Sequence, residues 1–431
     1  MNAIENARRG YNIWKKLGFE ARAHVLVAVA HLLERDKNNF ARLMAHEMGK
    51  PITEGRAEIE KCAWACNYFA EHGPTMLGDD IRASNMKMTF VRYEPLGPIL
   101  AIMPWNYPFW QFFRMAAPAL IAGNSILLKH SLNTPKCAEA IENLFIEAKA
   151  PKYLVTNLVI AHEEIPEIIS DSRVKAVTLT GSTRAGAIVG ELAGRNLKKI
   201  VLELGGSDPF IILPDAKIEE VARFATHARC QNSGQSCIAS KRFIVHASIL
   251  DNFLKYFVKN MQNLILGDPL SEKTQIGPLA SKSQQLLLDS QVRDAQAKGA
   301  KTLCGGVLPS GPQSYYPPTV LTNITNSMRV YHEEVFGPVA CVYSFENIQD
   351  ALELANITSF GLSSSIWTTK ESEALELVND LEFGSVFINA IPRSDPRLPF
   401  GGIKDSGYGH ELGREGLMEF VNQKVVSIAD L

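Results

Sequence analysis

A regular alternation between short apolar runs and longer amphipathic runs begins at Pro98 and limits the possible folds more than any other pattern in the chain. Short apolar runs are typical of buried strands, and the runs between them have helical spacing. Strand and helix in alternation predict a parallel sheet with helices on both faces. The apolar runs of this first series are PILAIM at 98–103, SILLK at 125–129, YLVTNLVI at 153–160, VKAVTLT at 174–180 and KIVLEL at 199–204.

A second alternating series after Gly205 predicts a second α/β lobe. A chain of 431 residues is long enough for two lobes with separate cores. The segment before about Tyr68 has helical spacing and resembles two surface helices. The second series has apolar runs at 210–213, 241–247, 339–345, 363–369 and 385–389, and helical runs at 218–228 and 281–298.

Composition excludes several kinds of partner. With 44 basic and 46 acidic residues the net charge is -2, so no field exists to hold a nucleic acid. Three prolines interrupt the most apolar stretch, 96–113, which makes it a poor membrane span. The seven cysteines form no CxxC pair, and residues 1–16 lack the apolar core of a signal peptide. We therefore expect a cytoplasmic protein with no metal site and no membrane or nucleic-acid partner.

A turn of small residues at 181–186, GSTRAG, follows the run VKAVTLT and opens a helical run. At such a turn, backbone N–H groups and the positive end of the helix can approach a pyrophosphate. The turn is not the GxGxxG fingerprint, and a turn of this kind alone is more often only a tight connection.

Three side chains are candidate catalytic groups. Cys237 lies in the polar loop NSGQSC, where a thiol can be solvated as a thiolate, although most cysteines only pack. Glu203 ends an apolar strand, where its pKa can rise toward neutrality for general base catalysis; the alternative is a cap or an ion pair. Asn106 lies between two prolines, so it is either a rigid donor to an oxyanion or part of a plain turn.

Together these motifs resemble the aldehyde dehydrogenase superfamily over nearly the whole chain. The family pattern occurs in order as PWNYP at 104–108, LK at 128–129, GSTRAG at 181–186, LELGG at 202–206, GQSC at 234–237, EEVFGP at 333–338 and PFGGIKDSGYG at 399–409. Within the superfamily the chain looks most like bacterial succinate semialdehyde dehydrogenases. The resemblance implies two doubly wound α/β lobes, one for the cofactor and one for catalysis, with a small β oligomerisation element.

The resemblance also assigns roles. Cys237 would be the nucleophile, Glu203 the base, and Asn106 with the Cys237 N–H the oxyanion hole. The implied reaction is oxidation of an aldehyde, with NAD or NADP as hydride acceptor, to an acid through a thioester on Cys237. The cofactor-binding residues implied by the family are Trp105, Lys129, Gly181, Ser182, Gly186, Leu204, Glu334 and Phe336.

Cofactor choice depends on the residues after Lys129. Many NAD-preferring relatives carry a glutamate three residues on, where it repels a 2′-phosphate. Leu132 stands at that position, so NADP need not be excluded, and we expect a slight preference for it.

The substrate assignment rests on Arg114, eight residues after Asn106. A fixed guanidinium there suits a substrate carboxylate, unless Arg114 is an ordinary arginine on a helix surface. Position 231, where some relatives have a second carboxylate-binding arginine, is Gln. Succinic semialdehyde is the expected substrate, with glutaric semialdehyde or a neutral aldehyde as alternatives. Tyr107, Ser394 and Phe400 complete the predicted substrate site.

The predicted domains are 1–204 for the cofactor, with oligomerisation strands near 82–97, 205–411 for catalysis, and 412–431 for oligomerisation. The segments 86–93 and 424–429 match the family's oligomerisation strands, so we expect a homodimer or homotetramer. The sequence begins at the helix matched by 6–16 rather than at the β-hairpin that usually comes first, and we expect some loss of edge packing. The rival functions are a non-catalytic structural protein of this fold, which should have lost the catalytic groups, and a cofactor-independent thioesterase.

Overall fold

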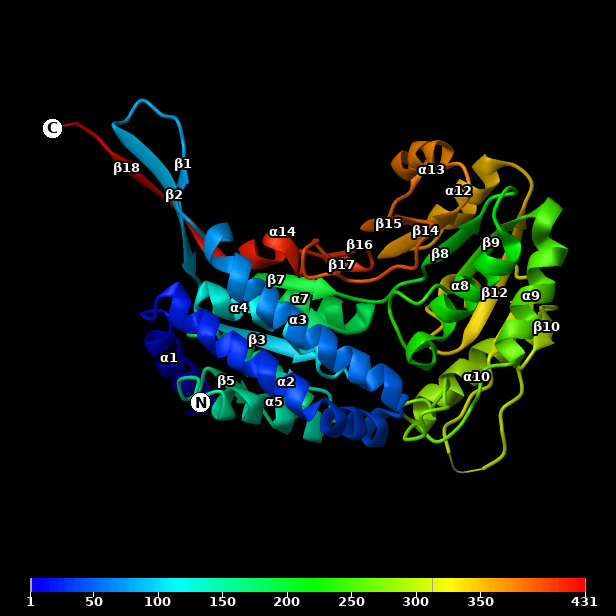
Figure 1. Cartoon of the computed structure of the whole chain (residues 1–431), viewed down its shortest axis with the longest axis horizontal. Helices are drawn as coiled ribbons and strands as arrows, with labels where there is room; N and C mark the ends of the chain where they lie inside the picture. Colours follow the sequence, from blue (N-terminus) through cyan, green and yellow to red (C-terminus); the bar gives the residue numbers. More distant parts are fainter. Residues whose placement is uncertain (1, 312, 431) are drawn as a thin grey trace.

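A computed structural model describes residues 2–311 and 313–430 and contains two large sheets, each covered by helices (Figure 1). The first sheet has the strand order β17-β7-β6-β3-β4-β5, and its strands are parallel except β17, which is antiparallel to β7. The strands are β3 Pro98–Met103, β4 Ser125–His130, β5 Val155–Asn157, β6 Ala176–Thr180, β7 Lys199–Glu203 and β17 Gly407–Tyr408. The predicted parallel sheet is confirmed, although β5 is shorter than its apolar run.

The helices of this lobe include three before the first large strand, not the predicted two surface helices. α3 buries one face, which includes Cys62, Cys66 and Phe69, and exposes the other, which includes Trp64. The segment of the prediction ends near Tyr68, inside α3, and so contains parts of three helices. The helices are α1 Asn2–Trp14, α2 Phe19–Met48, α3 Ile52–Met76, α4 Trp110–Ala122, α5 Pro135–Glu147, α6 Ile165–Ser170 and α7 Thr183–Arg195.

The second sheet has the strand order β10-β11-β12-β9-β8-β14-β15, parallel except for the pair β10 and β11. The sequence analysis missed these two strands because KTLC and TVLT contain polar residues and do not stand out as apolar runs. Strands of the sheet are β8 Pro209–Ile212, β9 Arg242–His246, β10 Lys301–Cys304, β11 Thr319–Thr322, β12 Val339–Phe345, β14 Ser363–Trp367 and β15 Ser385–Ile388. Its helices are α8 Ile218–Cys230, α9 Leu250–Gln262, α10 Lys282–Ala297, α11 Arg329–His332, α12 Ile348–Asn356 and α13 Glu371–Leu377.

The chain passes from the first sheet to the second over the buried residues 204–208. After β15 it returns to the first lobe through β16 Ile403–Lys404, which pairs with β13 Phe360–Gly361, and then through β17 and α14 Gly413–Met418. The exact domain limits given by the sequence remain a prediction. None of the helices in the described residues combines the length and apolar character needed to cross a membrane.

A separate three-stranded antiparallel sheet projects from the first lobe (Figure 1). β2 Met88–Pro95 pairs with β1 Asp80–Ile81 on one side and with β18 Val421–Ile428 on the other. Segments from the first quarter and from the end of the sequence therefore meet in one sheet.

Candidate active site

Cys237 lies where two cavities adjoin. It belongs to the wall of a cavity of about 250 Å³ and to the wall of another of about 240 Å³. The other six cysteines are buried, whereas Cys237 is partly exposed. Of the seven thiols, this one can therefore be reached by a molecule from either cavity.

The loop before Cys237 is held in an unusual backbone conformation. Asn232 and Ser233 have φ of 53° and 56°, in the left-handed region that is costly for residues with a Cβ. The Asn232 side chain offsets part of this cost by donating to the backbone oxygens of Asn106, at 2.8 Å, and Gln235, at 3.0 Å. Asn106 Nδ2 also donates to Gln235 O at 3.1 Å. The side chain proposed for the oxyanion hole and the thiol loop are thus fixed to each other.

Two carboxylates on α3 fix the same two loops from outside. Glu54 Oε2 accepts the Asn232 N–H at 2.7 Å, and Glu58 Oε1 accepts the N–H groups of Phe109 and Trp110 at 2.9 Å. Glu58 also forms a buried ion pair with Lys50. Burial raises the pKa of Glu54 to about 7, although Lys50 and the Asn232 N–H act in the opposite direction. Both loops are therefore set by one helix.

The surroundings of Cys237 act on the pKa of its thiol in opposite directions. Burial raises its pKa to about 12, while the positive charges of Arg114 and Lys241 oppose the rise. Lys241 Nζ donates to the backbone oxygens of Ser236, at 3.0 Å, and Cys237. The sequence of the loop did not show that Arg114 and Lys241 would lie near the sulfur.

Glu203 lies at the end of β7 next to Arg114 rather than in the wall of either cavity. Its Oε2 is 3.6 Å from Arg114 Nη2, and Arg114 Nε is paired with Glu411. Burial raises the pKa of Glu203 well above its ordinary value, with Arg114 opposing and Glu411 adding to the rise. The raised pKa agrees with the sequence-based expectation for this carboxyl group.

The cavity of about 250 Å³ contains most of the predicted cofactor residues. Trp105, Gly181, Ser182, Leu204, Glu334 and Phe336 line it together with Asn106 and Cys237. Ser182 caps α7 by accepting the Ala185 N–H, so the positive end of this helix faces the cavity. Gly186 is not in the wall: a Cβ there would lie 2.5 Å from Leu204 Cδ1, so its lack of a side chain lets α7 approach Leu204, the residue after β7.

Lys129 lies outside that cavity as well. It is the residue before the last of strand β4, and its Nζ is 3.5 Å from His162 Nδ1. Burial lowers the pKa of Lys129. Leu132, three residues further on, is 62% exposed and leaves this edge of the sheet without a carboxylate at that position.

The cavity of about 240 Å³ brings together three predicted substrate residues, Tyr107, Arg114 and Phe400. Arg114 is only 2% exposed, so it is not a helix-surface arginine. Its guanidinium, which packs on the Phe400 ring, is already paired with two carboxylates. The fourth predicted residue, Ser394, accepts hydrogen bonds from Lys61 Nζ at 2.8 Å and Trp110 Nε1 at 3.1 Å.

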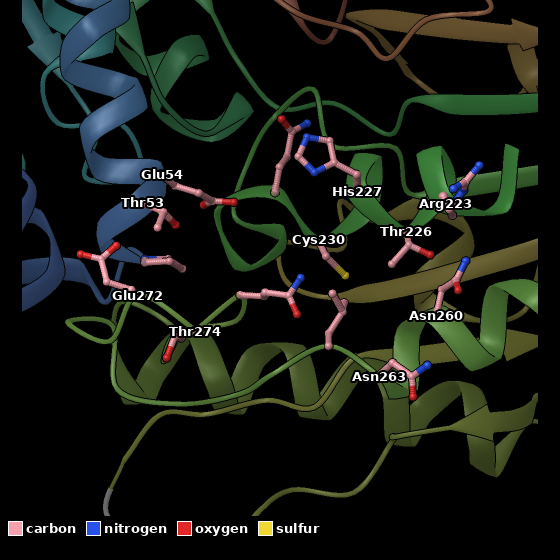
Figure 2. A pocket seen from close by; sticks show the side chains of 14 residues that line it. Thr53, Glu54, Arg223, Thr226, His227, Cys230, Asn260, Asn263, Glu272 and Thr274 are labelled. Atoms are coloured by element: carbon pink, nitrogen blue, oxygen red, sulfur yellow. The ribbon is translucent and has the colours of Figure 1, made fainter. Parts of the chain in front are cut away.

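A third cavity, of about 480 Å³, adjoins this one and is shown in Figure 2. The two share Glu54, His227 and Gln231 in their walls. In Figure 2, Thr53 and Glu54 come from α3 and face Thr226 and His227 of α8 across the space. Polar and apolar side chains both line this third cavity.

Comparison with known proteins agrees with this architecture. A profile of the aldehyde dehydrogenase family matches residues 1–426. The chain belongs to this family. It is 46% identical to a probable succinate-semialdehyde dehydrogenase [NADP(+)] of Synechocystis sp. and 47% identical to the succinate-semialdehyde dehydrogenase [NADP(+)] of Mycobacterium leprae, over 99% of this chain and 94% of each relative. The structure of succinic semialdehyde dehydrogenase from Streptococcus pyogenes, in complex with NADP+, superposes with a TM-score of 0.97 at 36% identity over 100% of this chain and 94% of that one.

The sequence reasoning missed several charged residues around this aldehyde dehydrogenase site. On α3, Glu54, Glu58 and Lys61 follow one another at helical spacing on one face, a signal that could have identified them. Lys241 and Glu411 gave no such signal, because only the fold brings them to Cys237 and Arg114.

Proposed function

We propose that this protein oxidises succinic semialdehyde to succinate with NADP as the preferred hydride acceptor. The position of Cys237 between a cofactor-type cavity and a cavity with basic side chains carries the proposal. The names of the relatives from Synechocystis, Mycobacterium leprae and Streptococcus pyogenes support the choice of substrate and of NADP. NAD as acceptor, and glutaric semialdehyde or a neutral aldehyde as substrate, are the alternatives.

The residues present fit a nicotinamide dinucleotide. The N-terminus of α7 at Gly181 and Ser182 suits a pyrophosphate, and Trp105, Phe336 and Glu334 offer two aromatic faces and a carboxylate for the nicotinamide ribose and ring. We assign the adenosine ribose to Lys129. When bound, the nicotinamide supplies the acceptor for the hydride. Since Leu132 has no charge to repel a 2′-phosphate, NADP should be accepted.

In the proposed mechanism, the thiol of Cys237 releases its proton to solvent, and the thiolate sulfur attacks the aldehyde carbon. Asn106 Nδ2 and the Cys237 N–H stabilise the oxyanion that forms, because they are donors on two loops that are fixed to each other. After hydride departure a thioester joins the substrate to Cys237. Glu203, whose pKa is raised, then takes a proton from the water that hydrolyses the thioester.

The test mixes the protein with an aldehyde and NADP or NAD and records the absorbance of the reduced cofactor. Reduction that requires the aldehyde is the expected result, and a greater kcat/KM is expected with NADP than with NAD. No reduction with either cofactor would refute the activity and favour a structural protein, while acid formation from a thioester without cofactor would favour the thioesterase. A rate with NAD and none with NADP would show that Lys129 is not placed as proposed.

We further propose a homodimer or homotetramer in the cytoplasm. β18 is an edge strand of the projecting sheet, and the sheet exposes apolar side chains, among them Ile81 at 78% and Val425 at 66%. Such an exposed edge is suited to pairing with another copy. The seven free thiols fit a reducing compartment. Light scattering coupled to size exclusion tests the assembly, and a monomer would refute it.

A further inference from the structure

Lys61 is a basic side chain of the substrate-side cavity whose ammonium has only neutral partners. It comes from α3 and lies in the same cavity wall as Cys237. Its Nζ donates to Ser394 Oγ at 2.8 Å and lies 4.4 Å from the centre of the Trp110 ring. No carboxylate among residues 2–311 and 313–430 forms an ion pair with Lys61.

Most other charged groups of this wall are paired or exposed, and Glu54 accepts the Asn232 N–H, with a pKa that burial raises to about 7. Arg114 is paired with Glu203 and Glu411, and Glu58 is paired with Lys50. Arg393, at the mouth, is exposed. A carboxylate that enters the cavity therefore meets the unpaired positive charge of Lys61.

We propose that Lys61, together with the Ser394 hydroxyl, binds the carboxylate of the aldehyde substrate. An ammonium on a partly dehydrated wall forms charge-assisted hydrogen bonds, which are stronger than neutral ones. Ser394 Oγ accepts from both Lys61 and Trp110, so its own proton remains available to the carboxylate. The volume of about 240 Å³ suits a small aldehyde acid rather than a long or bulky one. This inference rests on the proposed function and names the specificity residue of that site.

The surroundings of Lys61 support this role. Burial and the nearby Arg114 lower the pKa of Lys61 to about 8, whereas Cys62, Asp395 and Glu58 act in the opposite direction. A bound carboxylate would favour the charged form of Lys61 and so offset the effect of burial. The ammonium would in turn stabilise the bound carboxylate.

The test compares kcat/KM for succinic semialdehyde and for butanal in the wild type and in Lys61→Met, which keeps a flexible apolar chain on Trp110. The expected loss with succinic semialdehyde is about 10- to 100-fold, through KM, with butanal changed little. Lys61→Arg should restore most of the loss. Lys37→Met is the matched control, because Lys37 is a lysine of neighbouring α2 that pairs with Glu60 on the outside of α3.

A second measurement reports binding without turnover. Succinate should slow the alkylation of Cys237 by iodoacetamide in the wild type and in Lys61→Arg, and much less in Lys61→Met. Equal losses with both aldehydes in Lys61→Met, or unchanged protection by succinate, would overturn the role of Lys61. If the wild type prefers succinic semialdehyde and Lys61→Met keeps this preference, the role of Lys61 is refuted and the proposed substrate stands. A wild type that prefers butanal refutes the proposed substrate itself, and the role of Lys61 with it.

Discussion

Replacement of Arg114 by leucine should destabilise the fold in a pH-dependent way. Arg114 is the shared partner of Glu203 and Glu411, and the side chains of all three are at most 2% exposed. Removal of one partner from a buried ion pair leaves a charge with no compensation, which typically costs about 3–5 kcal/mol. We therefore expect Arg114→Leu to lower the free energy of unfolding, and to impair oxidation of charged and neutral aldehydes alike because Glu203 loses its neighbour.

The size of this loss follows from protonation. Burial raises the pKa of Glu411, and without Arg114 this carboxyl would keep its proton in the folded state. An unfolded glutamate has a pKa of about 4.3, which lies about 2.7 units below pH 7. At roughly 1.36 kcal/mol per unit, keeping the proton in the folded state lowers the free energy of unfolding by about 3.7 kcal/mol at pH 7. Because the folded pKa lies above the unfolded one, the penalty grows as pH rises and falls to about 1 kcal/mol at pH 5.

Urea unfolding followed by tryptophan fluorescence, at pH 5 and pH 7 and at one protein concentration, measures this difference. In the Arg114→Leu background, Glu411→Gln is the matched control: glutamine cannot ionise, so the part of the added pH dependence that comes from Glu411 should disappear and the part from Glu203 should remain. A loss below about 1 kcal/mol at pH 7, or a loss that is the same at both values of pH, would refute the reasoning about stranded carboxyl groups. If Arg114→Leu still oxidises butanal but no longer oxidises succinic semialdehyde, Arg114 binds the substrate carboxylate.

Three further outcomes are expected. Cys237→Ala should abolish oxidation while cofactor binding, followed by quenching of protein fluorescence, survives; turnover by this variant would exclude the thioester. Glu203→Gln should slow hydrolysis more than acylation, so that mass spectrometry detects the acyl-enzyme, and fast hydrolysis with no adduct would contradict its role as base. The preference for succinic semialdehyde over butanal should decline as pH rises through about 8, where Lys61 loses its proton, and should not vary there in Lys61→Met; a constant preference in the wild type would count against a charged Lys61.

Local sequence was enough to specify the parallel sheets and the family. Apolar runs alternating with helical runs require strands that are covered on both faces, and a run such as PILAIM at 98–103 is buried at all six positions because helices lie on both sides of it. The loop motifs at 181–186 and 234–237 were recognisable because they are contiguous. For the same reason, the motifs alone predict that Trp105, Gly181 and Phe336 lie near one cofactor.

Only the tertiary structure decided which charged side chains are ion-paired and which can meet a substrate. Arg114 appears in the sequence as an unpaired arginine, yet Glu203 and Glu411, from distant segments, neutralise it. Lys61 appears as one lysine on an amphipathic helix, yet packing places its ammonium beside Ser394 and away from any carboxylate partner in the described chain. The difference arises because pKa and pairing depend on burial and on neighbours within a few ångströms, which local sequence does not specify.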